Sequence, residues 1–106
     1  DEITNDYIFI KHDHSVYKTA HSDILFIEAY GNYVRVYTTE KKLVTRQTMT
    51  EMQKSLGDTH FVRVHKSYIV NISKINQIKN NQIYIGDKEI SIGTIYKSEL
   101  MKKMNI

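Results

Sequence analysis

The amino-acid sequence predicts a mainly β fold with one short central helix and a C-terminal helix. Short runs of β-branched and aromatic residues recur along most of the 106-residue chain, and polar turn residues separate them. Only two segments place apolar residues at helical spacing. Strands do not alternate with helices of ten or more residues, and this excludes a doubly wound α/β fold.

The first part of the chain is predicted to form strands joined by tight turns. Residues 1–6 are polar and are expected to be a linker remnant, so the predicted domain covers residues 7–106. Gly31 and Asn32 indicate a turn because both residue types tolerate positive φ. The expected strands lie at 7–10, 16–19, 24–27, 34–38 and 43–46, of which 24–27 is apolar enough for a buried central strand.

The first predicted helix begins at Thr48. Thr48 and Glu51 have the spacing of a capping box, in which the hydroxyl and the carboxylate each accept a hydrogen bond from a free backbone N–H. Gly57 provides a stop near residue 55 or 56. The apolar residues at helical spacing are Met49, Met52 and Leu56.

The second half is predicted to return to strands before a final helix. A strand is expected at 61–64, whereas residues 66–69 are compatible with either a strand or a single helical turn. Residues 83–85 and 89–92 have the pattern of a hairpin. A final helix is predicted from about Ile95 to Met104.

Composition excludes several classes of protein. The chain has no cysteine, which rules out disulfides and cysteine-based zinc sites and is compatible with a cytoplasmic location. No apolar run approaches the roughly 20 residues that span a bilayer, so no membrane association is expected. The net charge of +3 permits nucleic-acid binding without establishing it.

Catalytic and metal chemistry are weakly indicated. His12 and His14 would share a face of a strand, but no third metal ligand has a fixed spacing from them. His65 and Ser67 lie two residues apart, with no orienting acid or oxyanion turn placed by the sequence. No glycine-rich phosphate loop is present. We therefore expect no metal, no cofactor and no enzymatic activity.

The most informative stretch is Phe61-Val62-Arg63-Val64-His65-Lys66-Ser67-Tyr68-Ile69-Val70-Asn71. Its apolar residues can anchor a strand in a core, while the intervening polar residues supply cationic and hydroxyl donors. Such donors suit phosphate oxygens and base edges. From composition alone, however, a buried strand that ends in a solvated turn is the simpler interpretation.

This stretch resembles the Arg-x-His-x-Ser-(Tyr/Phe) signature of LytTR DNA-binding domains. A second resemblance is Ile24-Leu25-Phe26-Ile27-Glu28-Ala29 followed by Gly31-Asn32-Tyr33, and a third is Ile90-Ser91-Ile92-Gly93-Thr94-Ile95-Tyr96-Lys97. The three motifs occur in the family's order and span roughly residues 6–104.

The resemblance implies several small antiparallel sheets stacked into an elongated body. It also implies that loops, rather than a recognition helix, enter two successive major grooves of duplex DNA and touch the minor groove between them. Members of the family commonly occupy direct repeats and follow a receiver or sensor domain. We therefore expect the output domain of a bacterial transcriptional response regulator, monomeric alone and paired on DNA.

The resemblance also implies a set of DNA-binding residues. Tyr33, in the turn after Asn32, matches a position that reaches a major groove, and Lys66 matches one that enters the minor groove. Thr94 matches the position where the family usually has a base-reading Arg. The full expected set is Asn32, Tyr33, Arg46, Thr48, Lys66, Ser67, Thr94 and Lys97, of which Ser67, Lys97, Arg46 and Thr48 suit phosphate contacts.

Two departures from the family pattern leave an alternative open. Thr94 cannot make the bidentate guanine contact of an arginine, and Ser91 replaces the usual proline. The alternative is a protein-interaction module on the same fold with weakened or lost DNA recognition.

Several neighbouring residues are expected to have structural rather than DNA-binding roles. His65 is expected to bind the backbone and Asn71 to close a turn. Arg35 and Arg63 are expected on the solvated faces of their strands. Lys102 and Lys103 are expected to complement the dipole of the final helix.

Overall fold

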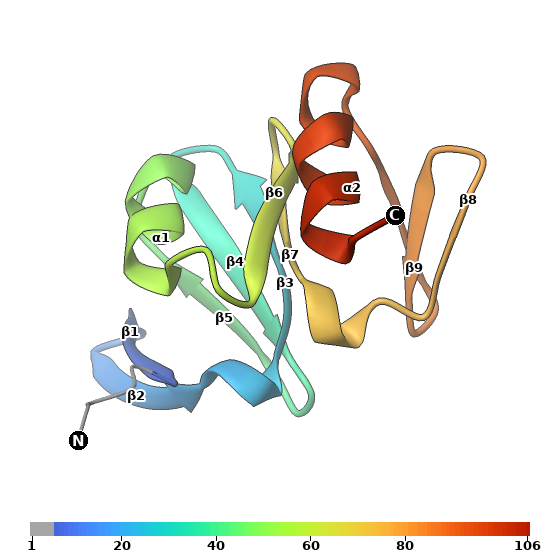
Figure 1. Ribbon diagram of the computed structural model, residues 1–106. Coiled ribbons are helices and arrows are strands. Elements are labelled where there is room, and N and C mark those ends of the chain that lie inside the picture. The colour runs from blue at the N-terminus through green and yellow to red at the C-terminus, as the bar shows by residue number, and fades with distance from the viewer. Residues whose placement is uncertain (1–5) are drawn as a thin grey trace.

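A computed structural model describes residues 6–106, and the predicted linker remnant at 1–6 lies almost entirely outside them. The described residues form three antiparallel sheets, two α-helices and three short 3₁₀ turns (Figure 1). The mainly β fold with two helices is confirmed. In chain order, the elements are β1 (Tyr7–His12), β2 (Ser15–Ala20), η1 (His21–Asp23), β3 (Ile24–Tyr30), β4 (Tyr33–Thr38), β5 (Lys42–Thr45), α1 (Met49–Leu56), β6 (Phe61–His65), β7 (Tyr68–Asn71), η2 (Ile72–Lys74), β8 (Gln77–Lys79), β9 (Gln82–Ile85), β10 (Lys88–Ser91), η3 (Thr94–Tyr96) and α2 (Lys97–Met104).

The central element is a five-stranded sheet with the strand order β5-β4-β3-β7-β6. Side chains of a strand alternate between its two faces, so each face of this sheet builds its own core. Ile27 faces a cluster completed by β1 and α1, whereas Phe26 faces a cluster completed by β9, β10 and α2. The two smaller sheets, β1-β2 and β10-β9-β8, therefore pack with the central sheet rather than extend it.

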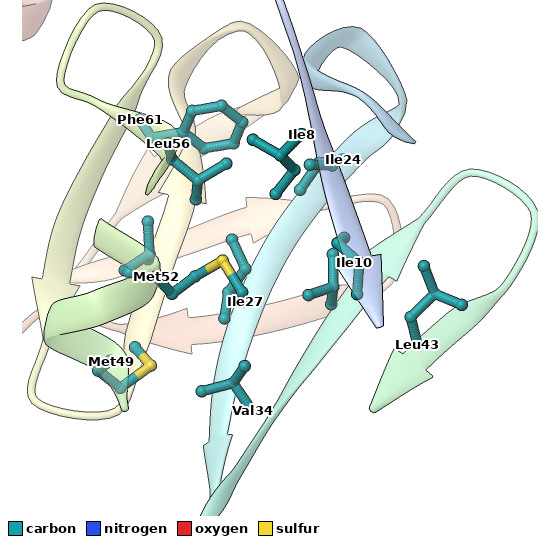
Figure 2. Packing of buried hydrophobic residues seen from close by; sticks show 12 residues of the cluster. Ile8, Ile10, Ile24, Ile27, Val34, Leu43, Met49, Met52, Leu56 and Phe61 are labelled. Atoms are coloured by element: carbon teal, nitrogen blue, oxygen red, sulfur yellow. The ribbon is translucent and has the colours of Figure 1, made fainter. Parts of the chain in front are cut away.

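The first core cluster shows how α1 is held on the sheet. Met49, Met52 and Leu56 of the helix point toward Ile27 and the neighbouring strands (Figure 2). Ile8 and Ile10 of β1 enter the same cluster, because alternate residues of β1 are buried. At roughly 25 cal/mol per Å² of buried apolar surface, this packing gives a short helix most of its stability.

The ends of α1 follow the predicted local chemistry. The Thr48 hydroxyl accepts from the Glu51 N–H at 3.0 Å, and the Glu51 carboxylate accepts from the Thr48 N–H at 2.9 Å. Gly57 has a φ of 76°, which favours glycine, and its N–H bonds the Gln53 carbonyl. The capping box and the glycine stop are confirmed.

The segment that the sequence leaves open between a strand and a helical turn forms a turn at 66–67 and then a strand. Tyr68–Asn71 forms β7, which pairs with β3 on one side and with β6 on the other. Two ladders of backbone hydrogen bonds therefore decide against the single helical turn at 66–69. Within this segment, the turn is confined to residues 66–67, which connect β6 to β7.

The final helix begins later than its sequence pattern predicts. Residues 94–96 form the 3₁₀ turn η3, and α2 starts at Lys97. The Gly93 N–H bonds the Val64 carbonyl at 2.7 Å, and a side chain at Gly93 would lie 2.9 Å from the Tyr96 ring. This close packing against β6 fixes the tighter turn before the helix.

The body measures 40 × 38 × 24 Å along its principal axes, so it is flat and nearly equal in its two longer dimensions. Neither α1 nor α2 is long and apolar enough to cross a membrane, and the described residues contain no other α-helix.

Candidate nucleic-acid interface

Strand pairing brings three connections to one edge of the molecule. β3 is antiparallel to both β4 and β7, so the β3–β4 turn at 31–32 lies beside the β6–β7 turn at 66–67. The bond from Gly93 to Val64 brings the 93–96 connection to the same end of β6. Figure 1 shows all three connections along the upper edge. They carry four of the eight predicted DNA-binding residues, and Tyr33 and Lys97 directly follow two of them.

The β3–β4 turn presents its side chains to solvent. Gly31 has a φ of 62°, which allows the tight two-residue connection. Asn32 is exposed, and Tyr33 keeps 43% of its surface exposed although it pairs with Tyr30 across the turn. A half-exposed tyrosine at a turn combines an aromatic face with a hydroxyl, and both can contact DNA.

The β6–β7 turn is held by hydrogen bonds that leave the Lys66 side chain exposed. The Arg63 guanidinium donates to the Lys66 carbonyl at 2.6 Å, and the Ser67 N–H donates to His65 Nδ1 at 3.1 Å. The Ala29 N–H donates to the Ser67 carbonyl at 2.8 Å. The backbone of the turn is therefore fixed, while the lysine ammonium remains in solvent. The expected backbone bond of His65 is confirmed.

The third connection exposes Thr94 and Lys97. Lys97 is the first residue of α2, where the helix dipole disfavours a positive charge. Ile95 between them is 82% exposed. These three side chains lack a packing role that would account for their positions.

Arg46 and Thr48 lie close to the β3–β4 turn and so belong to the same edge. Both line a shallow hollow together with Gly31, Asn32 and Glu51. Arg46 is exposed, so its guanidinium is free to reach a phosphate beside the turn. The Thr48 oxygen is occupied by the capping box, which leaves the hydroxyl proton as the group that can donate outward.

Two arginines have partners that the sequence did not indicate, so their expected solvated roles are corrected. Arg35 forms an ion pair with Glu28 at 3.2 Å, and its guanidinium lies 3.6 Å from the centre of the Tyr30 ring. Arg63 binds the Lys66 carbonyl and lies 5.9 Å from the Tyr96 ring centre. Glu28, Tyr30 and Tyr96 lie on other elements than the arginines they contact, so local patterns do not reveal these contacts.

Other predicted roles are refined in a similar way. Asn71 does cap η2 through Ser73, but it is also buried and binds the carbonyls of His21 and Ile24. Lys103 donates to the Asp58 carbonyl rather than acting only on the dipole of α2.

Two of the histidines considered for metal or catalytic chemistry bind backbone groups in the described residues. His12 Nδ1 accepts from the Val44 N–H at 3.0 Å, which ties the β1–β2 hairpin to β5. The bond between Ser67 and His65 uses the serine N–H rather than its hydroxyl. Residues 6–106 contain no group of three His, Cys, Asp or Glu side chains arranged to hold a metal ion.

Comparison with known proteins places this chain in a family. The model of the LytTr DNA-binding domain matches residues 14–105. The chain therefore belongs to the LytTR family of DNA-binding domains, a component of transcriptional regulators. A solved LytTr DNA-binding domain of a putative methyl-accepting/DNA response regulator from Bacillus cereus has the same fold, with a TM-score of 0.81 and 19% identity over 95% of this chain and 98% of that one.

Two curated relatives are similar in sequence. The transcriptional regulatory protein YpdB of Escherichia coli K12 is 35% identical over 83 residues, which are 76% of this chain and 34% of that protein. The sensory transduction protein LytT of Bacillus anthracis is 30% identical over 90 residues, which are 79% of this chain and 37% of that protein. The chain thus spans about a third of the length of these relatives.

Proposed function

We propose that this domain binds duplex DNA sequence-specifically, as the output domain of a bacterial transcriptional response regulator. The observation that carries the proposal is the single edge at which the turns 31–33 and 66–67 and the segment 94–97 lie together. Loops spaced along one edge suit insertion into successive grooves, with the Lys66 side chain in the minor groove between two major-groove contacts.

The wider context of this function is part of the same proposal. The intact protein carries a receiver or sensor domain upstream and acts in the cytoplasm. The domain is monomeric alone, and two copies pair on direct repeats of the operator. A stable dimer in sedimentation of the free domain would contradict this arrangement.

Selection of bound duplexes from a random pool tests the proposal. The selection uses moderate salt and excess nonspecific competitor, because phosphate contacts alone give salt-sensitive binding to any sequence. Enrichment of a motif repeated in one orientation, about one or two helical turns apart, is the expected result. Salt-sensitive binding without enrichment would contradict sequence reading. Complete absence of binding would favour the protein-interaction module, for which Thr94 in place of arginine is the supporting feature.

Lys66→Ala is expected to weaken binding to the selected duplex by roughly tenfold, because a groove contact is lost from a turn whose backbone stays fixed. The matched control is Lys41→Ala, which removes an exposed lysine from the β4–β5 turn at the opposite end of the sheet. Equal effects of the two variants, measured by anisotropy titration at one salt concentration, would remove Lys66 from the interface.

A further inference from the structure

Glu28 accepts hydrogen bonds from three side chains on two other strands. Its Oε1 accepts from the Tyr37 hydroxyl at 2.9 Å and from Arg35 at 3.2 Å. Its Oε2 accepts from the Tyr68 hydroxyl at 2.9 Å. The carboxylate lies in β3, directly opposite Arg35 of β4 on one side and Tyr68 of β7 on the other.

Two of these partners, Arg35 and Tyr68, lead to the two turns that lie side by side. Arg35 stacks on Tyr30, which is the residue immediately before the 31–32 turn. Tyr68 is the residue immediately after the 66–67 turn. The backbone bond from Ala29 to Ser67 joins the same two regions. One carboxylate therefore connects the bases of both turns through a short chain of polar contacts.

We propose that Glu28 is a positioning residue that fixes the turns 31–33 and 66–67 relative to each other and thereby sets the sequence specificity of the domain. This inference rests on the proposed function, since it assumes that both turns contact DNA. Glu28 itself is not expected to touch DNA, because its two oxygens are occupied by the partners described above.

The electrostatic surroundings of Glu28 keep its carboxylate charged. The Glu28 side chain is only 17% exposed, and burial by itself would raise its pKa. The hydrogen bonds from Tyr68 and Tyr37, with the charges of Lys88 and Arg35, outweigh burial and hold the pKa below its ordinary value. The group therefore stays ionised at neutral pH, and a charged acceptor makes shorter and stronger bonds than a neutral one.

The inference concerns specificity more than total affinity. Contacts to base edges require the side chains of both turns to reach their positions together, to within a fraction of an ångström. Contacts from flexible lysines to phosphates tolerate small displacements. Loosening the two turns should therefore reduce binding to the preferred sequence much more than binding to unrelated duplexes.

Glu28→Gln and Glu89→Gln form a matched pair for the test. Glu89 also accepts from a cross-strand tyrosine, Tyr84 at 3.4 Å, but it lies exposed on the β9–β10 hairpin, which carries no predicted DNA-binding residue. Both substitutions remove one negative charge, so any general gain in attraction to DNA is the same in both variants.

The first readout is the ratio of affinities for the selected duplex and for a scrambled duplex. Glu28→Gln is expected to lower this ratio about tenfold, the effect of losing one charge-assisted hydrogen bond, and Glu89→Gln is expected to leave it unchanged. Equal ratios in the two variants would overturn the positioning role. If the wild-type domain shows no preference for any duplex, the proposed function fails first, and this is a distinguishable result.

The second readout does not involve DNA. Amide hydrogen exchange of residues 29–33 and 65–68 is expected to accelerate in Glu28→Gln and to stay at the wild-type rate in Glu89→Gln. If Glu28→Gln does not fold, Tyr68→Phe removes one partner hydroxyl and keeps the charge, and faster exchange in the 66–67 turn is expected there. Unchanged exchange in both turns of a folded variant would overturn the inference.

Discussion

Replacement of Asn71 by alanine should cost far more stability than its size suggests. Asn71 is the last residue of β7 and is 1% exposed. Its amide nitrogen donates to the carbonyls of His21 at 3.0 Å and Ile24 at 2.9 Å. Its oxygen accepts from the Ser73 N–H at 3.1 Å and from the Ser73 hydroxyl at 2.8 Å. One side chain thus ties η1 and β3 to η2.

The magnitude follows from the groups left behind. Asn71→Ala leaves two carbonyls and one N–H around a buried position without their partner, and each lost bond of this kind costs about 1 kcal/mol. We expect a loss of about 3 kcal/mol in the free energy of unfolding. A domain of this size has a total of about 5–15 kcal/mol, so the variant should fold with a melting temperature lower by roughly 15 °C.

Urea unfolding of Asn71→Ala and Asn76→Ala provides the assay. Asn76 also uses its side-chain oxygen to hold a backbone group, accepting from the Gly86 N–H at 2.7 Å, but the site is exposed. Water can replace that bond, so Asn76→Ala should cost about 1 kcal/mol or less. If the two variants lose the same stability, the argument from buried partners is refuted.

Three further predictions concern pH and the DNA-binding edge. Burial, with the charge of His60, lowers the pKa of His21, so the unfolded chain binds more protons and stability should fall as the pH drops below about 6.5. His21→Phe should remove this slope in urea titrations at several pH values, and His14→Gln, at an exposed site, should keep it. Lys97→Ala should weaken binding to all duplexes about equally and flatten the salt dependence by about one, and a loss confined to one sequence would contradict a phosphate contact. Thr94→Arg should restore a guanidinium to the edge and strengthen binding about tenfold to duplexes with a guanine at one position; an unchanged base preference in selection would oppose this assignment.

Local patterns predicted the elements whose stability is local. The capping box at Thr48 and Glu51 and the stop at Gly57 depend on residues a few positions apart, and the structure confirms them. The apolar run 24–27 also became the central strand β3, because both of its faces are buried. The sequence pattern carried this information because burial on two faces requires continuous apolar residues.

Elements that depend on distant partners were not predictable in this way. Residues 68–71 became a strand because β3 and β6 lie on either side, and the late start of α2 follows from the contact between Gly93 and Val64. The hydrogen bonds around Glu28 depend on the register of three strands, so no spacing along the chain reveals them. The candidate DNA-binding residues were predicted from the family motifs, and strand pairing then brought most of these residues to one edge of the molecule.

The most direct test of the account is to follow backbone amide signals by NMR while the selected duplex is added. We expect the largest shifts at residues 31–33, 46–48, 66–67 and 94–97, which would place the duplex along the edge where these connections meet. The β4–β5 turn at 39–41, at the opposite end of the sheet, should remain unchanged. Shifts concentrated at that turn or on the β1–β2 hairpin, with the predicted edge unaffected, would contradict the central claim.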